Sequence, residues 1–99
     1  MTYRVTSRAE QDLAEIGDFI ARDNRRKAVQ FVDKIEAQFA KIAAQPTLYR
    51  KRDDLLQGLR ATSMGRYMIF FRCEENGDVV FLRVLHSARD QIEHLRGGR

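Results

Sequence analysis

An arginine inside an apolar run is the feature that most constrains how this chain folds. Residues 79–90 read VVFLRVLHSARD, and six of the first eight residues are apolar, which is typical of a buried strand. Arg83 lies in the middle of this run, and a buried guanidinium costs several kcal/mol unless it is paired or reaches solvent. The fold must therefore either supply Arg83 with a carboxylate, such as that of Asp12 or Glu15, or present it to a molecule outside the protein.

Length and composition predict one globular domain. The chain has 99 residues, of which 43% are hydrophobic, and this suffices for a single core. Residues 1–90 are expected to form the domain, and residues 91–99 a polar C-terminal tail. The single cysteine, Cys73, excludes an internal disulfide and a cysteine-based zinc site.

Charge and hydropathy bear on where the protein acts and on its partners. No apolar run is long enough to cross a membrane, and the N-terminal residues lack the core of a signal peptide, so we expect a cytoplasmic protein with no membrane partner. The net charge of +4 permits an acidic partner without requiring one. Two short basic runs, residues 25–27 and 50–52, fall in predicted connections and are typical of solvated surface.

Two amphipathic helices are predicted in the first half of the chain. Ser7 begins a capping-box pattern, SRAE, at the start of the first helix. The short break at residues 23–24 makes the two helices an antiparallel hairpin, and Pro46 ends the second one. The apolar stripes, with spacings of three and four, consist of Ala9, Leu13, Ile16 and Ile20, widened by Phe19, and of Ala28, Val32, Ile35, Phe39 and Ile42.

Short strands are predicted on both sides of this hairpin. Residues 3–5 alternate as an edge strand does, and the polar residues 47–57 indicate a loop. The loop would be anchored by Leu48, Tyr49, Leu55 and Leu56. A meander of three strands follows, at residues 58–62, 67–73 and 79–86, with turns at residues 63–65 and 74–78. The prediction is an α+β domain of order β-αα-βββ, in which the helix hairpin packs on a small, largely antiparallel sheet.

Patterns for cofactors and metals are missing from the sequence. There is no Gly-rich phosphate loop, and the two histidines have no carboxylate or thiol spacing that would complete a metal site. We therefore expect neither a cofactor nor a metal. Ser63 or Ser87 could be combined with His86 and Asp90 into a Ser-His-Asp set, but such common residues occur in any chain.

Arginines gather on the predicted sheet, and guanidinium groups suit a phosphodiester or carboxylate partner. In a regular strand Arg83 and Leu85 share the face of Phe81, whereas His86 lies on the opposite face. Arg83 and His86 should therefore not form a catalytic pair unless the strand bends after Leu85. His86 is either a general acid or base, or a strand-end histidine hydrogen-bonded into the structure. The arginines are Arg60, Arg66, Arg72 and Arg83, with Arg89 just beyond the last strand.

The ordered set of segments resembles the ParE toxins of the RelE/ParE superfamily of bacterial toxin–antitoxin modules. The resemblance runs from Tyr3 to about Asp90. The matching segments are residues 9–13 (AEQDL), Pro46 after the second helix, and residues 58–60 (GLR), 65–67 (GRY) and 83–86 (RVLH). It implies the same fold and a toxin that a ParD-type antitoxin neutralises in a hetero-oligomer.

Two targets follow from the resemblance. ParE-like toxins act on DNA gyrase, stabilise plasmids and need no direct sequence-specific contact with nucleic acid. RelE-like relatives cut mRNA on the ribosome with basic residues and a histidine or tyrosine near the end of the last strand. The ribonuclease set here would be Arg60, Arg66, Arg83 and His86. Because no tyrosine follows residue 67 to stack on a base, gyrase is favoured, and no catalytic residue is then implied.

The resemblance also points to contact residues. Antitoxins of this kind order a helix and an extended segment on an apolar surface of the toxin. The predicted antitoxin contacts are Phe19, Phe31, Phe39, Tyr49 and Phe71, along the hairpin and the sheet edge. The predicted target contacts are Arg60, Arg83, His86, Arg89 and Arg96, the last of which lies in the polar tail.

Overall fold

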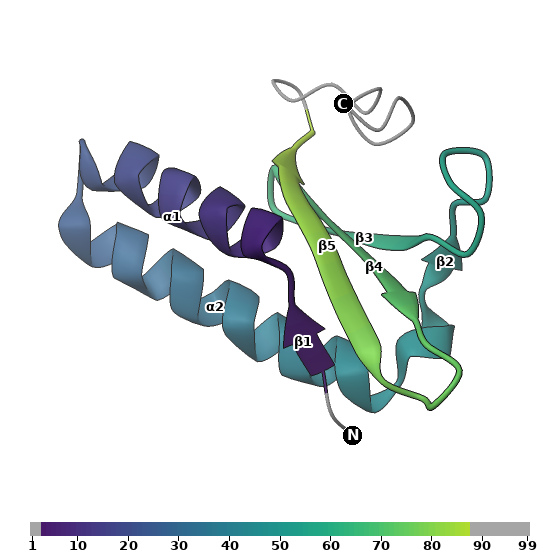
Figure 1. Ribbon diagram of the computed structural model, residues 1–99. Coiled ribbons are helices and arrows are strands. Elements are labelled where there is room, and N and C mark those ends of the chain that lie inside the picture. Colours follow the sequence, from purple (N-terminus) through teal and green to yellow (C-terminus); the bar gives the residue numbers. More distant parts are fainter. Residues whose placement is uncertain (1–2, 88–99) are drawn as a thin grey trace.

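A helix hairpin covers one face of a five-stranded sheet, so the molecule has two layers (Figure 1). The computed structural model describes residues 3–87, and it confirms the predicted α+β class. No helix within that range is long and apolar enough to cross a lipid bilayer. The elements are β1 (Tyr3–Val5), α1 (Ser7–Ala21), α2 (Arg25–Ala44), the 3₁₀ helix η1 (Pro46–Leu48), β2 (Arg50–Lys51), β3 (Arg60–Met64), β4 (Tyr67–Cys73) and β5 (Val79–His86).

The sheet is mixed, with the strand order β1-β5-β4-β3-β2. β1 is the predicted edge strand and lies parallel to β5, whereas the three other pairs are antiparallel. β1 reaches only from Val79 to Phe81 of its neighbour. Within the described residues, the second half of β5 therefore has no strand beside it on that side.

The main core lies between the hairpin and the sheet. The ring of Phe39 on α2 stacks on that of Phe81 at 4.1 Å, and Phe81 packs against Phe71 of β4 at 5.7 Å. Burial of each ring contributes about 1.5–3 kcal/mol, so this group joins α2 to the middle of the sheet. A smaller cluster lies on the other face of the sheet, at Leu59, Ala61, Phe70 and Leu85.

Each of the two α-helices follows a residue whose side-chain oxygen accepts a hydrogen bond from a backbone N–H in the first turn of the helix. Thr6 Oγ1 accepts from the backbone N–H of Ala9 at 3.1 Å, so Thr6 is the N-cap and the predicted cap at Ser7 is wrong by one residue. The cause is tertiary, because the Thr6 N–H still pairs with the carbonyl of Phe81 on β5 at 3.1 Å. Asn24, in the predicted break, caps α2 by accepting from the N–H of Lys27 at 3.0 Å.

The second half of the chain departs from the prediction at several positions. β3 begins at Arg60 rather than residue 58, because Gly58 adopts a positive φ of 80° in the preceding turn. The loop at residues 47–57 contains β2, and two of its predicted anchors, Leu48 and Leu56, are exposed instead of packed. Phe19 is likewise half exposed and does not widen the buried stripe of α1.

A β-bulge interrupts β5 at Leu82. Arg83 pairs with Phe70, but Phe71 pairs with Phe81, so Leu82 is an extra residue between the two pairs. The simple alternation predicted for this strand is therefore wrong at Phe81, which faces the helices while Arg83 lies in the row of Phe70. The bulge leaves His86 in the row of Tyr67, so the predicted separation of Arg83 and His86 is confirmed.

Candidate functional site

The buried guanidinium of Arg83 has a carboxylate partner. Its Nε donates to Asp12 Oδ2 at 2.8 Å and its Nη2 donates to Asp12 Oδ1 at 3.0 Å. Both side chains are largely buried, with exposed fractions of 13% for Arg83 and 8% for Asp12. The structure thus confirms the alternative in which the fold itself supplies Arg83 with a carboxylate. Asp12 is the partner, whereas the exposed Glu15 accepts from Gln11 at 3.1 Å.

Asp12 also forms a hydrogen bond with the backbone of β5 along the edge that β1 does not cover. Its Oδ2 accepts from the N–H of Val84 at 3.0 Å, and Thr6 Oγ1 donates to the carbonyl of Leu82 at 3.1 Å. The start of α1 thus replaces a strand on this side of β5, immediately after the bulge. Arg83 is a part of this closure, so its main role in the described structure is to tie β5 to α1.

The other predicted arginine and histidine positions have different surroundings. Arg60 is partly buried, and its Nη1 donates to the carbonyl of Tyr49 at 2.7 Å. Arg66 is exposed in the turn between β3 and β4, and its carbonyl accepts from the N–H and Oγ of Ser87. His86 is partly buried and meets the ring of Tyr67 edge-on at 5.2 Å.

The four residues of the predicted ribonuclease set, Arg60, Arg66, Arg83 and His86, do not converge on one point. Arg60 lies opposite Phe71, whereas His86 lies opposite Tyr67, four residues away along β4 and hence about 13 Å along the sheet. Only Arg66 and His86 lie at the same end of the sheet. Within residues 3–87 there is also no group of three or more His, Cys, Asp or Glu residues that could hold a metal ion.

The predicted antitoxin contacts differ in how much surface they offer. Phe39 and Phe71 are core residues with almost no exposed surface, so neither ring is accessible to a partner in this conformation. Phe31 and Tyr49 are partly buried, packed against Tyr67 and Phe71 respectively. Phe19 is half exposed. Two of the predicted target contacts, Arg89 and Arg96, lie outside the described residues.

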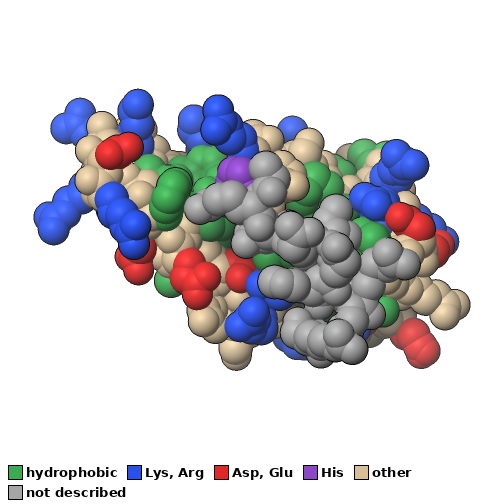
Figure 2. Space-filling view, turned by 90° about the horizontal axis from the view of Figure 1, so that it is seen from above, with side chains coloured by type: hydrophobic (Ala, Val, Ile, Leu, Met, Phe, Trp, Pro, Cys, Tyr) green, Lys and Arg blue, Asp and Glu red, His purple; other side chains and the backbone are tan. Residues whose placement is uncertain are grey.

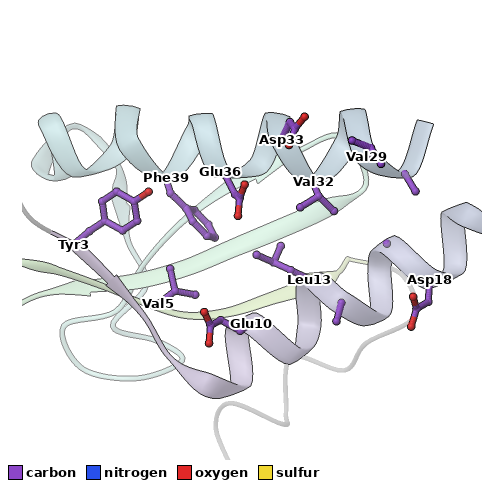
Figure 3. Close-up of a pocket in the computed structure, with 13 residues that line it drawn as sticks. Tyr3, Val5, Glu10, Leu13, Asp18, Val29, Val32, Asp33, Glu36 and Phe39 are labelled. Atoms are coloured by element: carbon purple, nitrogen blue, oxygen red, sulfur yellow. The ribbon is translucent and has the colours of Figure 1, made fainter. Parts of the chain in front are cut away.

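A groove between α1 and α2 is the main feature that the sequence did not indicate. It has a volume of about 560 Å³ and reaches from β1 along both helices (Figure 3). Its apolar surface includes Leu13 of α1 and Val32 of α2, and Figure 3 shows Glu36 projecting from α2 into the space between the helices. Among residues 3–87, no lysine, arginine or histidine lines the groove, whereas four carboxylates do: Glu10, Asp18, Asp33 and Glu36.

The turn of the hairpin carries the opposite charge. Figure 2 shows lysine and arginine side chains gathered at this end of the molecule. The residues at the turn are Arg22, Arg25, Arg26 and Lys27, all of them exposed. Residues 25–27 form the first turn of α2 rather than the predicted connection, and no acidic residue lies in that turn. Cations at a helix N-terminus oppose the helix dipole, so this arrangement costs stability.

The family of the chain follows from its sequence and fold together. A model of the family described as the ParE toxin of the type II toxin–antitoxin system parDE matches residues 3–91. Toxin ParE1 of Mycobacterium tuberculosis, in strains CDC 1551 / Oshkosh and ATCC 25618 / H37Rv, is 29% identical over 94 residues, which cover 94% of this chain and 96% of the relative.

Two solved structures share the fold. The chromosomal ParDE system from P. aeruginosa matches with a TM-score of 0.75 and 21% identity, covering 87% of this chain and 95% of that one. The toxin–antitoxin complex RelBE2 from Mycobacterium tuberculosis matches with a TM-score of 0.59 and 25% identity, covering 86% and 88%. Because the family model spans most of the chain and the topology agrees, this chain belongs to the ParE toxin family of type II toxin–antitoxin systems.

Proposed function

We propose that this chain is a cytoplasmic toxin that inhibits DNA gyrase and is neutralised by a ParD-type antitoxin in a plasmid-stabilising module. Membership of the ParE family over residues 3–91 supports the toxin and its antitoxin partner. The observation that favours gyrase over RNA as the target is the dispersal of Arg60, Arg83 and His86 over the sheet.

This dispersal matters because cleavage of RNA needs convergent groups. A general acid, a general base and a cation that stabilises the phosphate must all lie within hydrogen-bond distance, about 3 Å, of one phosphodiester. Arg83 is engaged with Asp12, and Arg60 is engaged with the carbonyl of Tyr49. A toxin that acts by binding an enzyme needs only a complementary surface, which exposed cations and apolar side chains supply.

A supercoiling assay tests the proposed target. Purified toxin added to gyrase and relaxed plasmid is expected to block supercoiling, and co-purified antitoxin is expected to restore it. His86→Gln should keep inhibition within about twofold, because no proton transfer is involved. Full supercoiling in the presence of excess folded toxin would reject gyrase as the target.

The second candidate function is ribosome-dependent cleavage of mRNA. It is favoured by one observation, that Arg66 and His86 lie at the same end of the sheet, where His86 ends the last described strand. In a translating extract this function predicts cleaved mRNA, and His86→Gln should lower the cleavage rate at least ~10²-fold. Arg72→Gln, at an exposed position on β4, is the matched control and should leave the rate unchanged.

The role of the tail in target binding stays a prediction. Truncation after residue 90 removes Arg96 and should weaken gyrase inhibition if the tail contacts the target. Equal inhibition by the truncated and full chains would contradict that role, while leaving the proposed target untouched.

A further inference from the structure

The groove between α1 and α2 presents apolar surface to solvent. Val29 lines its end near the hairpin turn, and 62% of this residue is exposed. Val32 and Ala14 continue the apolar surface toward β1, where Val5 lies. Concave apolar surface of this kind is where proteins bind partner segments. The groove is long and open along the helices, which suits an extended or helical segment better than a small molecule.

The carboxylates beside this surface decide which segment fits. Glu10 and Asp18 stand on α1, and Asp33 and Glu36 stand on α2, so acidic side chains occupy both sides of the groove. All four are exposed, and none forms an ion pair with another residue of the described structure. The local charge is thus opposite in sign to the net charge of +4 of the chain. An apolar segment with its own carboxylates would be repelled here, whereas lysine or arginine would be attracted.

We propose that this groove receives an amphipathic segment of the antitoxin whose apolar side chains cover Val29 and Val32 and whose lysine or arginine side chains pair with the four carboxylates. This inference rests on the proposed antitoxin partner and adds the chemistry of the segment that binds. The charge of the groove is the main support for this proposal, because acidic residues surround an exposed apolar surface in a chain whose net charge is +4.

The positions of the carboxylates set the length of the segment. Glu10 and Asp18 are eight residues apart on α1, which corresponds to about 12 Å along the helix axis. A helical segment of about two turns covers this distance. Arg22 and Arg25 lie beyond the Asp18 end, so the antitoxin residues that follow the cationic segment in that direction should be acidic or polar.

The test measures binding of the antitoxin encoded beside the toxin to full-length toxin variants. Glu10→Gln/Glu36→Gln removes two charges while keeping side-chain shape, and the affinity should fall about tenfold or more at 0.1 M salt (roughly physiological screening), with a weaker dependence on salt. Glu15→Gln/Glu75→Gln removes the same charge at exposed positions outside the groove and should leave the affinity unchanged. Circular dichroism confirms that each variant is folded.

A second pair of variants tests the apolar contact. Val29→Ser should weaken binding about tenfold, because an exposed valine is expected to become buried on binding. Leu48→Ser is the control, since Leu48 is 72% exposed but lies outside the groove. Equal binding by wild type and both groove variants would overturn the groove as the docking site while leaving the antitoxin partner intact.

Two further outcomes would show that the groove does not bind the antitoxin. If the antitoxin fails to bind wild-type toxin, the proposed function itself fails. If toxin alone forms a dimer that Glu36→Gln dissociates, a second copy of this chain fills the groove, and the proposal is overturned. Analytical ultracentrifugation of the free toxin distinguishes this case.

Discussion

Removing one partner of the ion pair between Asp12 and Arg83 should be one of the most destabilising single substitutions in this domain. Asp12→Asn removes the carboxylate that accepts both hydrogen bonds from Arg83, whose side chain is only 13% exposed. Breaking a buried pair by removing one partner costs about 3–5 kcal/mol. A domain of this size has a stability of about 5–15 kcal/mol, so Asp12→Asn should remove a large part of it.

Urea unfolding measures this cost. With a denaturant slope of about 1.5 kcal/mol per molar, a loss of about 3 kcal/mol lowers the unfolding midpoint by about 2 M. Arg83→Met keeps the aliphatic stem but leaves the carboxylate of Asp12 buried, so its cost should be similar. The double variant Asp12→Asn/Arg83→Met retains an oxygen that accepts from the N–H of Val84 and should cost no more than either single variant, which corresponds to a coupling of at least about 3 kcal/mol.

An exposed pair on the same sheet is the control. Arg72 lies 3.7 Å from Glu74 and its side chain is 48% exposed, so Arg72→Met should cost less than about 1 kcal/mol. If the single variants at Asp12 and Arg83 also cost less than about 1 kcal/mol, and their effects add, the buried pair does not tie β5 to α1. Arg83 would then become available again as a target contact.

Three further predictions concern the hairpin and are measured by the same urea titration. Thr6→Ala should lower the free energy of unfolding by about 1–2 kcal/mol, because it removes the N-cap of α1 and a hydrogen bond to β5. Ser7→Ala should change the free energy of unfolding by less than about 0.5 kcal/mol. A larger cost for Ser7→Ala than for Thr6→Ala would show that Ser7 is the cap, as predicted from the sequence. Gly17→Ala should stabilise α1 by about 0.5–1 kcal/mol, since the added methyl would lie 3.6 Å from Val32 of α2, an ordinary van der Waals distance. A lower free energy of unfolding for this variant would mean that α1 and α2 pack too tightly at Gly17 to accept the methyl group. Arg25→Glu and Arg26→Glu should each add about 0.3–1 kcal/mol by reversing an unfavourable charge at the start of α2, and unchanged midpoints would show that solvent screens the helix dipole there.

The elements that depend on local pattern were predictable from the sequence. The apolar stripes of both helices, the N-terminal edge strand and the last two strands lie where periodicity put them, because each pattern reports which side of one element is buried. The sequence also predicted that Arg83 needs either a carboxylate inside the fold or a molecule outside it, since a buried unpaired charge is costly. It could not choose between these two alternatives, and the structure supplies Asp12.

The features that depend on packing between distant segments were not predictable. The bulge at Leu82 arises where β5 must pair with β4 on one side and meet α1 on the other, and nothing in the strand itself marks it. The cap of α1 moved to Thr6 because pairing with β5 continues to that residue. The groove brings carboxylates of α1 and α2 onto one surface. In the sequence, the acidic residues of each helix are spaced as on an ordinary solvated helix face, so their convergence could not be foreseen.

Net charge is a poor guide to the antitoxin of this toxin. A value of +4 favours an acidic partner, but charges more than about 8 Å away are largely screened at physiological salt, so a docked segment responds to its immediate surroundings. Those surroundings are acidic in the groove and basic at the hairpin turn. An antitoxin that is acidic overall should therefore still place lysine or arginine among the apolar residues of the segment that enters the groove. Its carboxylates should lie outside that segment, where they meet the cations of the turn; an interface segment with carboxylates among its apolar residues would contradict this account of the charge.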